Sequence, residues 1–184
     1  MKFVGYNIVF QEIPDEITLA INISNCPNRC EGCHSPHLQE DTGEELTERV
    51  LYDLLEKYGN AVTCVCFMGG DNSPEEVLKL ASFVRKAASK ACHSALDAEF
   101  PEERLLIIRG LRVESATTEA PIKTAWYSGN PNLYDNAQQY FDYIKLGKYM
   151  EELGGLNYPT TNQRFYRVED KEMIDITERF YNNE

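Results

Sequence analysis

Three cysteines lie within eight residues of one another, in the segment Cys26-Pro-Asn-Arg-Cys30-Glu-Gly-Cys33-His-Ser-Pro. Pro27 and Gly32 disfavour a continuous helix, so this segment is expected to be a loop. Thiolates are soft donors that bind iron–sulfur clusters, and a cubane cluster usually takes four of them. Three thiolates can hold three irons and leave the fourth open to a small molecule. The spacing therefore predicts a [4Fe–4S] cluster held by Cys26, Cys30 and Cys33.

The three cysteines allow two other interpretations. A structural zinc ion would need a fourth ligand, which His34 or His37 could supply. Zinc sites more often combine two C-x₂₋₄-C pairs, and no second pair is evident in this sequence. Inert core cysteines fit poorly with so polar a loop. By contrast, Cys64 and Cys66 alternate on a predicted strand and are expected to pack in the core, and Cys92 is expected to be structural.

A second motif, Phe67-Met68-Gly69-Gly70-Asp71, follows the apolar run over residues 61–68. That run is typical of a strand buried on both faces. Two glycines allow the backbone to approach a ligand closely, and their carbonyl groups can accept hydrogen bonds from an ammonium group. Asp71 either orients such a ligand or caps the helix expected to start near Ser73.

Together the two motifs resemble the radical S-adenosylmethionine superfamily. With glycine at position 32, the Cys-x-Gly-Cys segment resembles the corresponding segment of the activating enzymes of anaerobic ribonucleotide reductase. The Gly-Gly-Asp form of the second motif resembles the same enzymes. Weaker similarities are Thr124 to Gly129, a strand that ends in a small polar residue plus glycine, then Asp142 to Lys148, and the turn Thr161 to Arg164. The resemblance runs from residue 3 to residue 168.

This resemblance implies an enzyme whose cluster binds S-adenosyl-L-methionine at its open iron. Gly69, Gly70 and Asp71 are then expected to line the methionine end of that ligand, and Ser128 and Gly129 to touch it. The implied partners are the large component of anaerobic ribonucleoside-triphosphate reductase, as protein substrate, and a flavodoxin-like electron donor. An activase of another glycyl-radical enzyme, a small-molecule radical enzyme and a non-catalytic Cys₃His zinc module are the alternatives.

The elements expected around these motifs alternate between strands and helices. Strands are expected over 2–10, 17–23, 61–68, 104–108, 122–127, 143–146 and 164–168, and helices over 44–58, capped by Thr42, and from Ser73 onward. Alternation of this kind predicts a mostly parallel sheet, and the length allows about six units of an incomplete, open β/α barrel. We expect one domain over residues 1–184, with 92–121 as an insertion.

Composition narrows the class of protein further. The 184 residues include 18 Lys and Arg against 30 Asp and Glu, which gives a net charge of −12 and a pI near 4.7. Such a surface repels nucleic acid and anionic membranes unless its basic residues cluster, and no such cluster is found in the sequence. The sequence also lacks an apolar run long enough to span a membrane and a secretory signal, so a cytoplasmic location with reduced thiols is expected.

Overall fold

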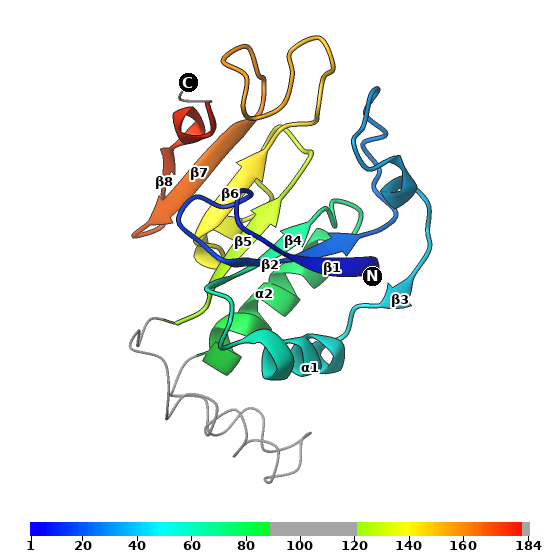
Figure 1. Ribbon diagram of the computed structural model, residues 1–184, viewed down its shortest axis with the longest axis vertical. Helices are drawn as coiled ribbons and strands as arrows, with labels where there is room; N and C mark the ends of the chain where they lie inside the picture. The colour runs from blue at the N-terminus through cyan, green and yellow to red at the C-terminus, as the bar shows by residue number, and fades with distance from the viewer. Residues whose placement is uncertain (89–120, 182–184) are drawn as a thin grey trace, which may run out of the picture.

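One eight-stranded sheet forms the centre of the protein (Figure 1). The computed structural model describes residues 1–88 and 121–181. The strands follow the spatial order β3-β1-β2-β4-β5-β6-β7-β8. They are β1 (Lys2–Val9), β2 (Thr18–Ile23), β3 (Glu44–Glu45), β4 (Cys64–Met68), β5 (Lys123–Tyr127), β6 (Tyr143–Leu146), β7 (Arg164–Glu169) and β8 (Glu172–Asp175).

The sheet is mixed, so the expectation of an incomplete β/α barrel of about six units with a mostly parallel sheet is wrong. Only the central pairs β2–β4, β4–β5 and β5–β6 are parallel, while β1–β3, β1–β2, β6–β7 and β7–β8 are antiparallel. Within the described ranges there are two α-helices, α1 (Glu48–Tyr58) and α2 (Pro74–Ala88). The connection after β5 contains only a 3-10 turn at Ala137–Gln139, and the one after β6 contains no helix.

The two faces of the sheet carry different cores. Side chains alternate along β4, so Val65 and Phe67 pack with α1 and α2, while Cys64 and Cys66 pack on the opposite face. The helix-side core is the larger one. Its members from the helices include Leu51, Leu54, Leu55, Val77, Leu80, Ala81 and Val84. The expected insertion (92–121), the expected strand at 104–108 and Cys92 lie outside the described residues, apart from Pro121.

Helix α1 begins later than the sequence predicts. Its N-cap is Thr47, whose hydroxyl accepts from the backbone N–H of Val50 at 3.3 Å, so Thr42 is not the cap. Residues 44–45 instead form the short strand β3 against β1. Leu46 is buried, and its N–H donates to the carbonyl of Met1 at 2.9 Å. Leu46 is buried in the same core as the apolar face of α1, but it lies in the extended segment before the helix. The apolar repeat therefore includes Leu46, and the sequence predicts a helix that starts too early.

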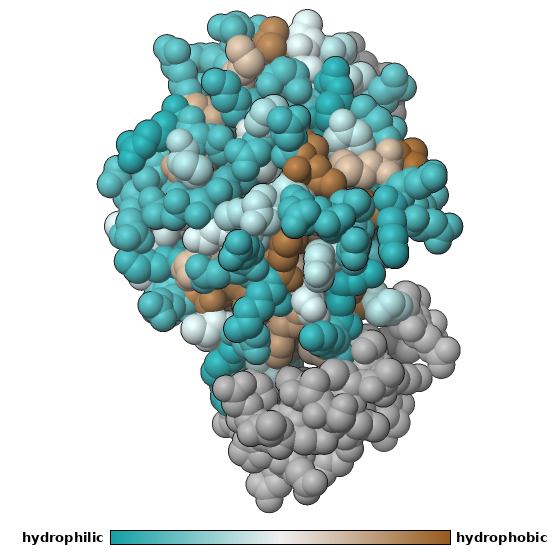
Figure 2. All heavy atoms as spheres, turned by 180° about the vertical axis from the view of Figure 1, so that it is seen from behind, coloured by the Kyte–Doolittle hydropathy of each residue, from teal (hydrophilic) through white to brown (hydrophobic). Residues whose placement is uncertain are grey.

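The face of the protein seen from behind is largely hydrophilic, with hydrophobic residues exposed in small separate groups (Figure 2). This agrees with a chain in which 26% of residues are charged. Neither α1 nor α2 is long and apolar enough to cross a membrane, and the described residues contain no other helix that is.

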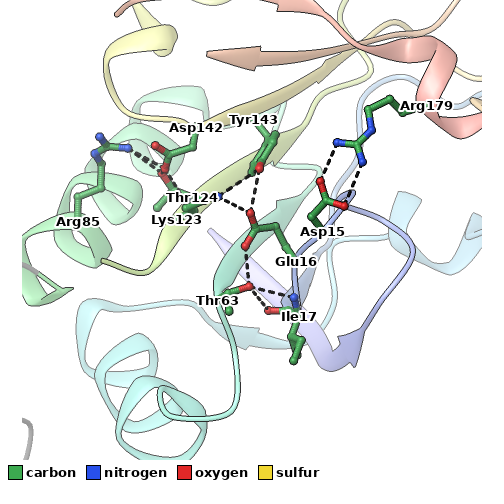
Figure 3. A network of polar contacts seen from close by, with 10 residues as sticks. All are labelled: Asp15, Glu16, Ile17, Thr63, Arg85, Lys123, Thr124, Asp142, Tyr143 and Arg179. Carbon is green, nitrogen blue, oxygen red and sulfur yellow. Dashed lines mark hydrogen bonds and ion pairs between the residues drawn. The ribbon is translucent and has the colours of Figure 1, made fainter. Parts of the chain in front are cut away.

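A buried carboxylate joins the amino ends of the parallel strands (Figure 3). Glu16, which is 6% exposed, precedes β2. It accepts hydrogen bonds from the hydroxyl groups of Thr63 at 2.6 Å and Tyr143 at 2.9 Å. It also pairs with the ammonium group of Lys123 at 2.5 Å. Burial, followed by the hydrogen bond to Glu16 and its charge, raises the pKa of Tyr143 to about 12. Four strand starts are therefore held by one side chain, opposite the edge where the cysteine loop lies.

Replacing Glu16 by alanine should destabilise the fold by about 3 kcal/mol, because it removes the buried acceptor of the Tyr143 hydroxyl, the Thr63 hydroxyl and the Lys123 ammonium group. Urea unfolding at neutral pH would measure this change. The control is Asp15→Ala, which removes an exposed carboxylate bound to Arg179 at 2.8 Å and should change the midpoint much less. Equal midpoint shifts for the two variants would contradict a structural role of the buried network.

Candidate functional site

The cysteine loop leaves the carboxyl end of β2 and folds back on itself. The N–H of Cys26 donates to the carbonyl of Leu38 at 2.9 Å, and the preceding Asn25 donates to Glu40 at 3.0 Å. Left-handed backbone at Arg29 and Gly32, with φ of 43° and 67°, turns the chain between the cysteines. The segment is thus a loop, as its proline and glycine content predicts.

All three loop cysteines are free thiols and half-buried. The N–H of Ser35 donates to the Cys33 sulfur at 3.4 Å, and the Asn28 amide lies 3.9 Å from the Cys26 sulfur. Across residues 1–88 and 121–181, no three His, Cys, Asp or Glu side chains stand close enough to hold a metal ion. The donors suit an iron–sulfur cluster in type and number, and they must close around it when it binds.

The second motif forms a tight turn directly after β4. Gly69 and Gly70 have φ of 102° and 88°, a region that side chains other than glycine rarely adopt. A Cβ atom on Gly70 would lie 2.4 Å from the side chain of Val77 in α2. The Gly69 carbonyl accepts from the indole of Trp126 at 2.8 Å, and the Gly70 carbonyl accepts from the N–H of Ser73 at 2.9 Å. Each carbonyl therefore already has one protein donor.

Asp71 connects the two motifs to the end of β5. Its carboxylate accepts from the Asn28 amide at 2.6 Å, the Ser128 hydroxyl at 2.6 Å and the Gly129 N–H at 2.7 Å. We call these four residues the Asp71 junction. Of the two roles weighed for Asp71, capping of α2 finds no support, because these contacts lead to the cysteine loop and β5. Ser128 is 2% exposed, so it reaches the site through Asp71.

A buried lysine at the end of β6 is the residue that the sequence analysis missed. Lys145 is 7% exposed, and its ammonium group donates to the carbonyl of Gly147. Burial lowers the pKa of this group to about 8. Negative charge on Asp71, Cys30 and Cys26 acts on the same pKa in the opposite direction. A lysine inside a four-residue buried strand is unusual, and that was the available signal.

A cavity of about 750 Å³ lies beside the cysteine loop. Cys33, Lys145 and Gln163 are among its lining residues, together with Tyr127 at the end of β5. The Tyr127 hydroxyl donates to the carbonyl of Glu12 at 2.5 Å, and burial raises its pKa well above the usual value. Tyr127 and Lys145 bring the carboxyl ends of the parallel strands β5 and β6 into this cavity wall, at the edge where α/β sheets place their ligands.

The remaining candidate residues take structural positions. Cys64 and Cys66 are fully buried, and burial raises the pKa of both thiols, as expected for core cysteines. The ring of His34 packs against Tyr149 with centroids 4.7 Å apart. The polar turn at residues 161–164 bonds to its own backbone and to the loop after β6, for instance through the Asn162 amide to the Lys148 carbonyl at 3.0 Å.

Comparison with known families identifies the class of protein. The sequence model of a family described as a 4Fe–4S single cluster domain matches residues 17–111, just over half of the chain. The chain therefore belongs to this family, and the predicted iron–sulfur cofactor is supported. The matched segment contains both the cysteine loop and the Gly69–Asp71 turn. Neither the curated proteins nor the solved structures give a match.

Proposed function

We propose that this protein is an activating enzyme that cleaves S-adenosylmethionine reductively at a [4Fe–4S] cluster and generates a glycyl radical on anaerobic ribonucleoside-triphosphate reductase. Cys26, Cys30 and Cys33 would hold the cluster. The observation that carries the proposal is the Asp71 junction, which joins the cysteine loop, the Gly-Gly-Asp turn and the end of β5. The family match supports the iron–sulfur part of the proposal, and the partner rests on the sequence resemblance.

The chemistry requires one electron, which a flavodoxin-like donor would supply. A cluster held by Cys26, Cys30 and Cys33 would supply this electron to the sulfonium of S-adenosylmethionine, which would then break into methionine and a 5′-deoxyadenosyl radical. That radical takes a hydrogen atom from a glycine Cα of the partner, leaving 5′-deoxyadenosine and the glycyl radical. One electron is consumed and one hydrogen atom moves in each activation.

The chain's own residues bind and orient the reactants. The glycines at 69 and 70, with φ of 102° and 88°, allow the tight turn after β4 that brings Asp71 to the cysteine loop. Asp71 is held by three donors, so the turn and the loop keep a fixed relation. The cavity beside Cys33 and Tyr127 gives a partner loop a path to the reactive atoms. A protein substrate suits this arrangement because its glycine must reach the radical before water or oxygen does.

The test is anaerobic reconstitution with iron and sulfide, followed by reduction in the presence of S-adenosylmethionine and the large reductase component. We expect four irons per chain, stoichiometric 5′-deoxyadenosine and a glycyl-radical signal in electron paramagnetic resonance. A second glycyl-radical protein in place of the reductase tests the identity of the partner. About one zinc per chain with no visible absorbance would refute the proposal in favour of a structural zinc module.

A further inference from the structure

Lys145 is a buried cation without an ion-pair partner. It lies on β6 between Ile144 and Leu146, and its side chain is almost inaccessible to water. No carboxylate of the described ranges lies within ion-pair distance of its ammonium group, although nine other pairs are formed there. Among the residues that the structure describes, its one hydrogen-bond acceptor is the carbonyl of Gly147. Burying an unpaired charge is costly, so an anion is expected nearby in the functional protein.

The neighbouring groups narrow the identity of that anion. The negative charges that act on Lys145 are those of Asp71, Cys30 and Cys26. Asp71 is already satisfied by three donors within the Asp71 junction. Tyr127, its neighbour in register on β5, donates to a backbone carbonyl and offers no negative charge. The cysteine sulfurs become thiolates when they hold a cluster, and they are then the nearby anions whose charge has no protein partner of comparable strength.

Lys145 also faces the same space as the third cysteine. Both Lys145 and Cys33 line the cavity beside the cysteine loop. Burial lowers the pKa of the Lys145 ammonium group, and negative charge on Cys26 and Cys30 acts to raise it. The side chain emerges from a central strand of the sheet, which fixes its position more firmly than a loop would. The placement is thus a built feature of the sheet.

We propose that Lys145 supplies the positive charge that favours the reduced form of the cysteine-held cluster and thereby raises its reduction potential. The inference rests on the proposed cluster at Cys26, Cys30 and Cys33. An oxidised core bound by three thiolates carries a net charge of about −1, and reduction adds one more negative charge. A nearby fixed cation therefore stabilises the reduced form more than the oxidised form. Lys145 acts through the cluster and is a positioning residue, not a catalytic one.

The size of the effect follows from Coulomb's law. At an effective dielectric constant of about 20, a unit charge about 10 Å away changes a one-electron equilibrium roughly tenfold. A tenfold change corresponds to 59 mV for a one-electron couple. An exposed lysine has a much weaker effect, since water and salt screen its charge.

The test measures the midpoint potential of the reconstituted cluster without S-adenosylmethionine, by redox titration followed with electron paramagnetic resonance. We expect Lys145→Met to lower the ratio of reduced to oxidised cluster about tenfold at a fixed potential, and Lys145→Arg to restore it. Lys145→Gln is a second neutral variant in case the methionine variant binds too little iron. Lys148→Met, at an exposed position on the following loop, removes the same charge and should leave the potential unchanged.

An unchanged or raised potential in both neutral variants would overturn the inference, as would an equal shift in Lys148→Met. Wild-type protein assayed in parallel for 5′-deoxyadenosine tests the proposed function separately. If the wild-type protein cleaves S-adenosylmethionine and the Lys145 variants have the same cluster potential as wild type, only the role of the lysine is refuted. A wild-type protein that binds the cluster and shows the lysine effect without cleavage refutes only the proposed reaction.

Discussion

Cys30→Ala is expected to abolish cluster binding and, with it, the reductive cleavage of S-adenosylmethionine. The loop offers three thiolates for three irons, so removing one leaves a site with two. The thiols of Cys64 and Cys66 cannot substitute, because both are fully buried in β4 and burial keeps them protonated. We expect the affinity of the loop for iron to fall by more than about a hundredfold, because mutation of a residue that only hydrogen-bonds to a metal ligand already lowers metal affinity about 10- to 100-fold.

The matched control for this prediction is Cys64→Ala. It removes a thiol of the same chemistry from the core, where it contributes packing alone, so iron content should stay at the wild-type level. Iron and sulfide analysis, together with the 400 nm region of the absorption spectrum, compares the two variants. If Cys30→Ala retains four irons and wild-type formation of 5′-deoxyadenosine, the assignment of the cluster to this loop is wrong.

The parts of the site that could be predicted from sequence are local ones. The cysteine loop and the Gly69–Asp71 turn are each read from a few adjacent residues, whose spacing carries the chemistry directly. Asn28 and Lys145 could not be assigned in this way. Their roles arise from contacts across the sheet, such as the bond from Asn28 to a residue 43 positions later. An isolated amide has no pattern that marks it as part of a site, and the one signal for Lys145 is its charge within an otherwise apolar strand.

The fold shows the same division between local and distant information. Most described strands begin and end within a few residues of the expected positions, because apolar runs and β-branched residues set them. The direction of a strand depends on the connection that leads to it. The sequence therefore does not predict that the outer strand pairs of the sheet are antiparallel. The turn between β7 and β8 places Asp170 and Lys171 at φ of 50° and 71° without any glycine, so the sequence lacks the usual hairpin signal.

The structure also changes the meaning of the acidic composition. A net charge of −12 argues against polyanionic partners, and a cluster with three thiolates makes the site itself negative. S-adenosylmethionine would bring a sulfonium cation to that site, while Lys145 places one fixed positive charge beside it. The field at the carboxyl edge of the sheet is thus expected to favour both a cationic ligand and an added electron.

Asp71→Asn is expected to have the second-largest effect, because it disrupts the Asp71 junction without creating a cavity. The amide offers one oxygen acceptor in place of two, so an NH₂ group faces either the Ser128 hydroxyl or the donors from Asn28 and Gly129. We expect a loss of about 2–4 kcal/mol in the free energy of unfolding. Formation of 5′-deoxyadenosine should fall about a hundredfold, since a displacement of about 1 Å between reacting groups has that cost.

Single removal of the other members separates the contributions within the Asp71 junction. Asn28→Ala releases only the cysteine loop, so it should weaken 5′-deoxyadenosine formation with a smaller loss of stability than Asp71→Asn. The loss of activity in the double variant, expressed as a free energy, should be smaller than the sum of the losses in the two single variants, because both substitutions remove the same contact. Asp53→Asn, which affects an exposed pair with Arg49 on α1, is the control and should match wild type. Fully additive losses, or wild-type activity in Asp71→Asn, would show that the Gly-Gly-Asp turn and the cysteine loop act independently.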